Sequence, residues 1–471
     1  MIKFKLLFLS LLLALVGCKG ETNINDNSID NLPKETYVLV HSAWLGKWQW
    51  ENIVPILTNK GHKVIAPDLP GDGSDGTPAS DITMDDYVNT LVSILDEQDK
   101  PVILVGHSFN GITISRVAEL RPNKVKSLVY MAAFLLPNES SFLGAVQGVS
   151  GSNAVDNFKV SDDGYSAYIN ENQQKNALVH DVSQEFYDVN IKPYIVSEPL
   201  SPLKYKLQIT DKNFGRIPKY YIETTEDKAI PIEIQKRMYN GNVLKVYTLN
   251  SSHCPNFSQP KKLAEVLLDV VNEQEKKDLI MSHFEKEEEV KVHRLFSNEN
   301  QIFAHFESKR GGEKYAHMAL LEITGDKKIY TTIQKVPENQ ISENRMFEGV
   351  RLVSTNSNHT VSNLTHINNF IKNVWIDGKY ETLPDFFNNG KLMQHNPSVQ
   401  DDVQGLYDLL DYLNSQGITL KYEEIVTSFA KGNMVLVYSK GTFGGDNYLF
   451  ADLFRLENQK IVEHWDVIEQ K

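Results

Sequence analysis

The sequence predicts an α/β fold for about the first 275 of its 471 residues, followed by an α+β region with antiparallel strands. In the first part, apolar runs typical of buried strands end in polar loops and give way to helical patterns, as after residues 101–105. In the second part, two stretches alternate apolar and polar residues and are joined by turns that contain Gly or Asn. The length also suits two or three domains.

The first candidate site is a serine at the junction of a strand and a helix. The apolar run 101–105 stops at Gly106-His107-Ser108, and a helical pattern follows. Such a junction is typical of a nucleophile elbow, a sharp turn that exposes the serine hydroxyl and brings helix amides close to a forming oxyanion. We therefore predict that Ser108 is a catalytic nucleophile.

Candidate partners for the serine follow in the order acid, then histidine. Asp227 comes after a strand-like run at 219–224, and His253 comes after another at 246–249. Singly, a turn serine, a helix-capping aspartate and a surface histidine are the commoner interpretations. Together, at the carboxyl ends of strands and in this order, they predict a triad in which His253 takes the proton of Ser108 and Asp227 orients the imidazole.

An oxyanion hole is predicted from the loop after the first strand. Residues 36–40 are predicted as a strand, and the loop 41–46 lies where this type of fold donates a second backbone amide. We assign the hole to the backbone N–H groups of Ala43 and Phe109. This chemistry needs no metal or organic cofactor, and the sequence shows no ligand cluster for one.

Further motifs surround the predicted triad. They are His41-Ser42-Ala43-Trp44, Trp48-Gln49-Trp50, the residues 61–71, Tyr130-Met131-Ala132-Ala133-Phe134, Gln235 with Met238, and Ser252-His253 through Ser258-Gln259-Pro260. With these motifs, residues 36–271 resemble the α/β-hydrolase branch of plant methylesterases, hydroxynitrile lyases and bacterial pyrethroid-type carboxylesterases. The resemblance implies a doubly wound, mostly parallel sheet in a domain at 36–275, with a helical cap at about 136–216 after the sixth core strand.

Three positions depart from the usual pattern of this branch. Asn110 replaces a glycine two places after the serine; because asparagine tolerates unusual backbone angles, we expect strain there without loss of the turn. Ser42 also replaces a glycine, and hydroxynitrile lyases of the branch carry a hydroxyl residue there, so Ser42 and Trp44 are candidate substrate-binding residues. Those lyases carry a lysine where this chain has Cys254, which ranks ester hydrolysis above lyase activity.

The predicted cap carries aromatic side chains in helical stretches. They either pack within the cap or line a pocket for the acyl or alcohol group, and the sequence does not choose between these roles. The composition favours a mainly apolar, covered site over an open polymer-binding cleft. The aromatic residues are Phe158, Tyr165, Tyr168, Phe186, Tyr187 and Tyr194.

The amino terminus predicts a secretory signal. Two lysines precede an apolar run at 6–16 that is too short to span a membrane. The string Leu15-Val16-Gly17-Cys18 resembles a bacterial lipobox. By this resemblance, residues 1–17 are removed, Cys18 is lipidated, and residues 18–35 tether the chain to a membrane of the bacterial cell envelope, on its extracytoplasmic side. An ordinary signal peptide and an uncleaved anchor are the alternatives.

Charge and cysteine content exclude some classes of protein. A formal net charge of −13 argues against nucleic-acid binding. Cys254 is the other cysteine, so a lipidated Cys18 leaves no disulfide within the mature chain. Charged runs at 272–278 and 285–289 mark the end of the first domain as helical or linker material.

The tail contains an internal repeat. The second copy has helices predicted at about 364–378, 381–388 and 401–414 before its strands, whereas the first copy, at 285–350, lacks that helical half. The alignment pairs Gln301-Ile302-Phe303-Ala304, Gly311-Gly312, Tyr315, Leu320-Leu321-Glu322-Ile323 and Lys328-Ile329 with Met434-Val435-Leu436-Val437, Gly444-Gly445, Tyr448, Leu453-Phe454-Arg455-Leu456 and Lys460-Ile461.

The complete copy carries Met393-Gln394-His395-Asn396-Pro397, Asp452-Leu453-Phe454-Arg455 and Ile461-Val462-Glu463-His464-Trp465-Asp466-Val467. With these strings, residues 364–471 resemble the SnoaL-like polyketide cyclase family, whose cone-shaped α+β fold is shared with ketosteroid isomerases. In such cones, inward-facing acidic and histidine side chains serve acid–base steps on carbonyl compounds. The resemblance implies four pocket residues, His395, Asp452, His464 and Asp466, and leaves open whether they catalyse or only line a binding pocket.

The first copy has lost these pocket groups. Ala319 stands at the aligned position of Asp452, and Thr332 and Gln334 stand at those of His464 and Asp466. We therefore expect the first copy to be structural and to cover the sheet of its sibling as a dimer partner would. A homodimer through the SnoaL-like region is a further prediction.

Taken together, the motifs predict a membrane-tethered, extracytoplasmic serine esterase of small carboxylic esters, joined to a second small-molecule pocket. Three alternatives stay open. They are a hydroxynitrile lyase-like C–C cleavage by the same triad, an isomerase, cyclase or hydratase activity of the carboxy-terminal pocket, and ligand binding without turnover.

Overall fold

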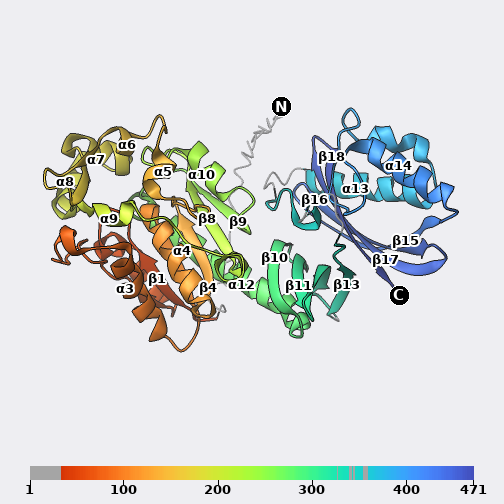
Figure 1. Cartoon of the computed structure of the whole chain (residues 1–471), viewed down its shortest axis with the longest axis horizontal. Helices are drawn as coiled ribbons and strands as arrows, with labels where there is room; N and C mark the ends of the chain where they lie inside the picture. The colour runs from red at the N-terminus through yellow and green to blue at the C-terminus, as the bar shows by residue number, and fades with distance from the viewer. Residues whose placement is uncertain (1–32, 326, 339–341, 343–344, 354–358) are drawn as a thin grey trace, which may run out of the picture.

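The computed structural model describes residues 33–471, apart from 326, 339–341, 343–344 and 354–358 (Figure 1). The predicted signal peptide at 1–17, the lipidation site Cys18 and the tether up to residue 32 lie outside the described residues. Within the described ranges, no helix is both long enough and apolar enough to cross a lipid bilayer.

The amino-terminal half contains a six-stranded parallel sheet in the order β2-β1-β3-β4-β8-β9. All carboxyl ends of its strands therefore lie at one edge, where loops can bring distant residues together. The predicted parallel α/β sheet is confirmed. Its strands are β1 (Thr36–Val40), β2 (Lys63–Ile65), β3 (Val102–His107), β4 (Val125–Met131), β8 (Lys219–Thr224) and β9 (Lys245–Leu249).

Helices cover both faces of this sheet, because alternate strand residues such as Leu104 and Val105 are apolar on both sides. One face packs against α3 (Met84–Asp96), α4 (Gly111–Leu120) and α10 (Ile232–Tyr239). The other packs against α2 (Val54–Asn59) and the first half of α12 (Pro260–Met281). The charged run 272–278, predicted as helix or linker, is helical and lies within α12.

The segment between β4 and β8 is the predicted cap; it follows the fourth strand of this sheet along the chain, whereas the sequence placed it after a sixth core strand. Its short helices are α5 (Phe142–Val146), α6 (Asn153–Asp156), α7 (Glu171–Leu178), α8 (Gln184–Asn190) and α9 (Leu200–Leu203). It also holds a small antiparallel sheet of β5 (Phe158–Val160), β6 (Ser166–Ile169) and β7 (Glu198–Pro199), in a segment that the sequence predicted as helical. Strands of two to four residues are too short for their alternation to be distinguished from a helical pattern.

The carboxy-terminal half contains two sheets, which are mainly antiparallel. The first comprises β10 (Glu288–Ser297), β11 (Gln301–Arg310), β12 (Glu313–Glu322) and β13 (Lys328–Lys335). The second has the order β14-β18-β17-β16-β15, built from β14 (Met393–Gln394), β15 (Leu420–Lys431), β16 (Met434–Phe443), β17 (Asp446–Glu457) and β18 (Lys460–Gln470). The three predicted helical stretches are confirmed as α13 (Thr360–Phe370) with the π-helical Ile371–Ile376, the 3-10 helix Tyr380–Phe386, and α14 (Asp402–Ser415).

The four-stranded sheet lies between the parallel sheet and the five-stranded sheet (Figure 1). One of its faces packs on α12 through Ile280, and the other packs on the five-stranded sheet. The first copy of the repeat thus covers the sheet of its sibling, as predicted. The contact joins Phe303, Met318 and Leu320 of the first copy to Leu436, Leu453 and Trp465 of the second.

Strand register corrects part of the repeat alignment. Residues 323–327 separate β12 from β13, whereas only residues 458–459 separate β17 from β18. The pairing of β17 with β18 runs on to Glu457 and Lys460 through a register shift, whereas that of β12 with β13 ends at Glu322 and Lys328, so Ala319 pairs with Thr331 in the way that Asp452 pairs with Asp466. Thr331 therefore stands where Asp466 does, and Gln334 instead accepts a hydrogen bond from the Ile468 amide at 3.0 Å. The first copy still lacks acidic groups at these positions.

Candidate active site

Ser108 lies in a sharp turn between β3 and α4. Its φ of 57° falls in the left-handed region, which is costly for a residue other than glycine. Two close approaches accompany the turn: a Cβ on Gly106 would lie 2.8 Å from Ile114 Cδ1, and one on Gly111 would lie 2.5 Å from the carbonyl oxygen of Phe134. The backbone thus has the geometry of a nucleophile elbow.

Asn110 does not carry the strain that the sequence predicted there. Its φ is −69°, an ordinary helical value, and the strained residue of the turn is Ser108. The Asn110 amide nitrogen donates to the carbonyl oxygen of His41 at 2.8 Å, and its oxygen accepts from Thr113 Oγ1 at 2.6 Å. The prediction was wrong because the turn does not require a positive φ at Asn110. The side chain of Asn110 instead links the elbow to the loop after β1 through its hydrogen bond to His41.

Asp227 and His253 form a hydrogen-bonded pair, with Oδ2 of the aspartate 2.7 Å from Nδ1 of the imidazole. Both side chains are fully buried. The carboxylate is compensated by further donors: Oδ1 accepts from the Ala229 and Ile230 amides at 2.7 and 2.8 Å. Oδ2 also accepts from Thr224 Oγ1 at 2.9 Å and Gln235 Nε2 at 3.1 Å. These hydrogen bonds satisfy the buried carboxyl group and hold it in place.

The loop that carries His253 is tied to the serine elbow. The ring of His107, the residue before the serine, lies 4.7 Å from the His253 ring. Gln49 Nε2 lies 3.2 Å from His107 Nδ1, and His107 Nε2 lies 2.9 Å from the carbonyl oxygen of His253. Burial holds the pKa of His107 well below its usual value, so it is neutral and donates through Nε2.

The structure does not join the serine and the histidine directly. Among the described residues, Nε2 of His253 has no hydrogen-bond partner although it is buried. Ser108 lines the adjoining cavity. Serine–histidine hydrogen bonds are often long or misaligned in the absence of substrate and tighten in the substrate complex. The unpartnered nitrogen beside the elbow is therefore available as a proton acceptor.

The loop after β1 leaves the backbone amide of Ala43 without an acceptor among the described residues. The Ser42 amide donates to Gln49 Oε1 at 3.0 Å, and the Trp44 amide donates to Glu198 Oε2 at 2.9 Å. Between them, the Ala43 amide donates to none of the residues that the structure describes. Ala43 and Phe109 line the same cavity as Ser108, as residues of an oxyanion hole must.

The cavity next to Ser108 has a volume of about 140 Å³ and a mainly apolar lining. The cap contributes α5, α6 and the start of β5 to its wall, so the site is covered. A small apolar group joined to a polar reacting centre fits such a lining. The lining residues are Ala43, Trp44, Ser108, Phe109, Phe134, Phe142, Leu143, Val146, Ala154, Val155, Phe158, Ala229 and Ile230.

The remaining predicted residues of this half take different places. Trp44 lines the cavity, whereas Ser42 does not; its hydroxyl is buried without a hydrogen-bond partner among the described residues. Of the cap aromatics, Phe158 lines the cavity and Tyr187 packs in the core, while Tyr165, Tyr168 and Tyr194 are exposed. Cys254 is fully buried, and burial raises the pKa of its thiol well above the usual value, which makes it unreactive.

A second cavity, of about 60 Å³, lies inside the carboxy-terminal sheet and its helices. Asp452, His464 and Asp466 line it together with Tyr422. His464 Nε2 lies 3.0 Å from Asp452 Oδ1, and the Tyr422 hydroxyl donates to Asp452 Oδ2 at 3.2 Å. Asn396 donates to Asp466 Oδ2 at 2.7 Å, and Oδ1 of Asp466 is buried without a partner among the described residues. Burial raises the pKa of Asp466 above its usual value.

His395, the fourth predicted residue of that pocket, lies elsewhere. Its Nε2 pairs with Glu463 Oε1 at 2.8 Å, and its ring stacks on Trp465 at 4.8 Å. The neighbours Gln394 and Asn396 line the cavity instead. In an extended segment successive side chains point to opposite faces, so the pairing of Gln394 with His464 in the sheet turns His395 away. This alternation of side chains along the extended segment is the sequence signal by which Gln394 and Asn396 could have been identified as pocket residues.

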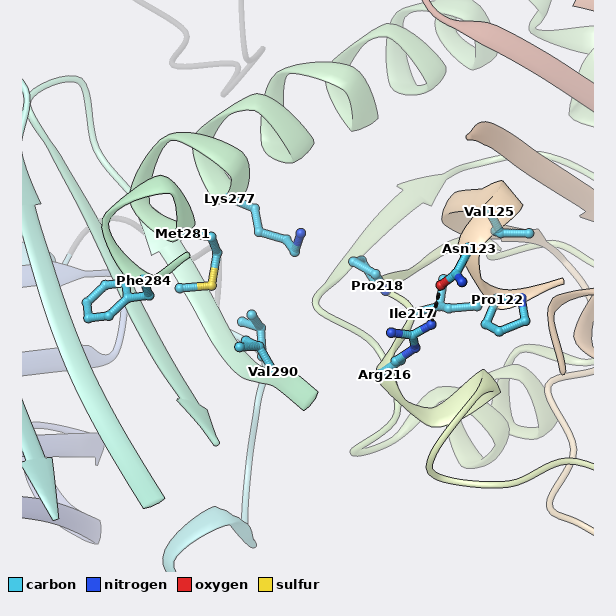
Figure 2. A pocket seen from close by; sticks show the side chains of 11 residues that line it. Pro122, Asn123, Val125, Arg216, Ile217, Pro218, Lys277, Met281, Phe284 and Val290 are labelled. Carbon is cyan, nitrogen blue, oxygen red and sulfur yellow. Dashed lines mark hydrogen bonds between the residues drawn. The ribbon is translucent and has the colours of Figure 1, made fainter. Parts of the chain in front are cut away.

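A larger cavity, of about 260 Å³, lies between the parallel-sheet half and the strand β10 (Figure 2). Its wall includes Lys277 and Met281 of α12 and Arg216, which donates to Asn123 Oδ1 at 2.6 Å. No residue predicted for either site lines it. Within the described ranges, no three His, Cys, Asp or Glu side chains converge as metal ligands would.

Comparisons with known proteins match the amino-terminal half. Residues 37–266 match the alpha/beta hydrolase family. The chain is similar to putative methylesterase 11, chloroplastic, of Arabidopsis thaliana, with 34% identity over 51% of this chain and 65% of the relative. It is also similar to alpha-hydroxynitrile lyase of Arabidopsis thaliana, with 30% identity over 50% of this chain and 96% of the relative.

A solved structure gives a similar result. The pyrethroid hydrolase from Sphingobium faniae has 27% identity and a TM-score of 0.47, over 51% of this chain and 98% of that chain. Of the first three curated relatives, all plant methylesterases, this chain covers only 58–65% of their own length.

Proposed function

The chain belongs to the α/β-hydrolase family, and we propose from this that it hydrolyses small carboxylic esters through an acyl-enzyme. One observation carries the proposal: the buried Asp227–His253 pair leaves Nε2 of the histidine unpartnered among the described residues, the His253 ring lies 4.7 Å from that of His107 next to Ser108, and Ser108 lines an apolar cavity. The similarity to methylesterases and to a pyrethroid hydrolase supports ester hydrolysis.

Each group has a role in this mechanism. Ser108 Oγ attacks the ester carbonyl while His253 Nε2 takes its proton, and the amides of Ala43 and Phe109 donate to the oxyanion. The imidazolium returns the proton to the alkoxide, which leaves as the alcohol. Water, deprotonated by His253, then attacks the acyl-enzyme and releases the acid. Asp227 holds the imidazole tautomer and stabilises its positive charge.

Phe142 of α5 lines the cavity and sets its size, so we expect Phe142→Ala to widen substrate range. In Phe142→Ala, the ratio of kcat/KM for p-nitrophenyl octanoate to kcat/KM for p-nitrophenyl acetate is expected to be about tenfold higher than in wild type. The reason is that one added methylene in an apolar pocket is worth about 1–3 kcal/mol. Tyr165→Ala, an exposed aromatic of the same cap, is the matched control. An unchanged chain-length profile in Phe142→Ala would place the substrate outside this cavity.

Lyase activity ranks below hydrolysis in this proposal. The hydroxyl of Ser42, which the resemblance to hydroxynitrile lyases singled out, does not line the cavity. Cys254 is a buried neutral thiol rather than a second basic group beside His253. Cleavage of mandelonitrile by the full chain, measured as benzaldehyde release, is expected to be negligible beside ester hydrolysis.

The carboxy-terminal half is proposed to be a SnoaL-like pocket domain at 364–471, preceded by a partial copy at 285–350. The acid–base array of Asp452, His464 and Asp466 around a cavity supports binding of a small carbonyl compound. Catalysis by this array is the second candidate function. A homodimer through this region stays a prediction; because the partial copy covers one face of the sheet, such a dimer needs another surface.

The two pockets are expected to act independently. His464→Ala should weaken binding of a small cyclic enone, such as 2-cyclohexenone, by about tenfold, because a buried hydrogen-bonding group contributes about 1–3 kcal/mol. Ester hydrolysis should stay within about twofold of wild type. Ligand-observed NMR and p-nitrophenyl ester assays measure the two effects. Loss of ester hydrolysis in His464→Ala would instead make the carboxy-terminal array the main catalyst.

We also propose that the chain is a lipoprotein, held at the extracytoplasmic face of a bacterial membrane through Cys18. On expression in a bacterium, Cys18→Ser is expected to move the chain from the membrane fraction to the soluble fraction and to abolish incorporation of labelled fatty acid. Cys254→Ser is the matched control, because it removes the other cysteine and should leave fractionation unchanged. Retention of Cys18→Ser in the membrane would contradict the lipid anchor.

A further inference from the structure

The residue after the proposed oxyanion donor Ala43 is held in place by the cap. Trp44 has a φ of 65°, a left-handed conformation that a bulky residue adopts only when its surroundings enforce it. Its backbone nitrogen donates to Glu198 Oε2 at 2.9 Å, and its indole nitrogen donates to the Ala167 carbonyl oxygen at 3.1 Å. Its carbonyl oxygen accepts from the Val196 amide at 2.9 Å. Three contacts with the cap therefore fix the backbone beside Ala43.

Glu198, the acceptor for the Trp44 amide, lies beside a second buried carboxyl group. Glu198 and Asp72 are both fully buried. The Tyr87 hydroxyl lies 2.7 Å from Asp72 Oδ2 and 3.0 Å from Glu198 Oε1, but one hydroxyl hydrogen serves only one of them fully. Oδ1 of Asp72 is buried and has no hydrogen-bond partner among the described residues, so no second donor compensates this pair.

The surroundings supply no positive charge to this pair. Among the described residues, neither carboxyl group forms a salt bridge with a lysine or arginine. Two other acidic residues lie nearby and add no positive charge. Asp68, in the same loop as Asp72, is negative and forms an ion pair with Lys47. Asp81, in the turn that packs on β7, is exposed to solvent. Tyr87 stays neutral, because burial raises its pKa well above the usual value. Two adjacent buried carboxylates would repel each other, so one proton is retained.

We propose that Glu198 is a positioning residue of the active site, and that one proton retained by the Asp72–Glu198 pair keeps Trp44, and through it the Ala43 amide, in place for the oxyanion. This inference rests on the proposed esterase function. The Trp44 amide favours the charged form of Glu198, so the retained proton lies on Asp72. Loss of that proton places two negative charges side by side and loosens the contact with the loop.

The pH dependence follows from the sign of the shift. Burial raises the pKa of both carboxyl groups, that of Glu198 to about 7 and that of Asp72 well above its usual value. A raised pKa means that the folded arrangement holds the proton more tightly than the unfolded chain does. The arrangement is therefore lost as the pH rises through the raised pKa of Asp72, the group that carries the proton. It adds an alkaline limb to the pH profile of kcat.

The test is the pH profile of kcat and KM for p-nitrophenyl butyrate, with the full chain and three variants. Glu198→Ala removes the acceptor of the Trp44 amide and is expected to lower kcat by about tenfold or more, with KM within about twofold. Asp72→Asn replaces the protonated aspartate with a neutral side chain of the same shape, so the alkaline limb should disappear while kcat at pH values below that limb stays within about threefold of wild type. Glu171→Gln, an exposed glutamate of the same cap, should behave as wild type.

The outcomes separate this inference from the proposed function. The positioning role would be overturned if Glu198→Ala kept the kcat of wild type, or if its KM rose by as much as its kcat fell. It would also be overturned if the alkaline limb persisted in Asp72→Asn. If Glu198→Ala fails to fold, as judged by circular dichroism, the Asp72→Asn profile decides alone. If wild type neither hydrolyses esters nor forms an acyl-enzyme at Ser108, the proposed function itself has failed.

Discussion

Ser108→Ala is expected to lower kcat for p-nitrophenyl ester hydrolysis by about 10⁴- to 10⁶-fold, the largest effect of any single substitution in this chain. Removing the hydroxyl removes the nucleophile, while the oxyanion donors and the cavity remain. Residual turnover then comes only from binding and from the amides of Ala43 and Phe109. KM should change little, because the alanine side chain fits wherever the serine did.

Steady-state kinetics on purified full chain measure this effect, with circular dichroism as a check on folding. Ser201→Ala, an exposed serine in the cap, is the matched control and should be indistinguishable from wild type. Hydrolysis that persists in Ser108→Ala would move the reaction away from the elbow. The cavity around Asp452 and His464 would then be the place to search for the catalyst.

Asp227→Asn is expected to lower kcat by about 10⁴-fold, because the amide favours the wrong imidazole tautomer at His253. The carboxylate accepts five hydrogen bonds through its two oxygens, including one from His253 Nδ1 at 2.7 Å. An asparagine offers one oxygen and an NH₂ group that cannot accept. Either orientation of the amide therefore leaves donors such as the Ala229 amide, or the imidazole, facing another donor.

The same substitution should also reduce stability. Each buried group left without its partner costs about 1–3 kcal/mol, so a lower melting temperature is expected together with the lost activity. Asp188→Asn, an exposed aspartate of the cap, is the control for both measurements. Activity within about tenfold of wild type in a folded Asp227→Asn protein would show that His253 is oriented by other means.

The parallel sheet and the elbow follow closely from sequence, because their signals are local. An apolar run that ends in Gly106-His107-Ser108 specifies both the strand and the turn, and Gly111 is the residue that the close approach to Phe134 requires. The pairing of Asp227 with His253 was inferable from chain order alone, since parallel strands bring their carboxyl ends to one edge.

Other features depend on contacts that no local pattern encodes. The strain expected at Asn110 lies at Ser108, because the surrounding packing decides which residue of the turn takes the left-handed angle. The link from Trp44 to Glu198 joins residues 154 positions apart in the chain. His395 was chosen by residue type, whereas the register of β14 on β18 places Gln394 in the pocket. Register is set by pairing and turn length, which residue type alone does not reveal.

The most direct test of the central claim is covalent labelling of the full chain with a fluorophosphonate, followed by peptide mass spectrometry. A serine activated by the unpartnered nitrogen of His253 should be labelled stoichiometrically at Ser108, and His253→Ala should slow labelling by about 10³-fold or more. Labelling at another residue, or an equal rate in His253→Ala, would contradict the account.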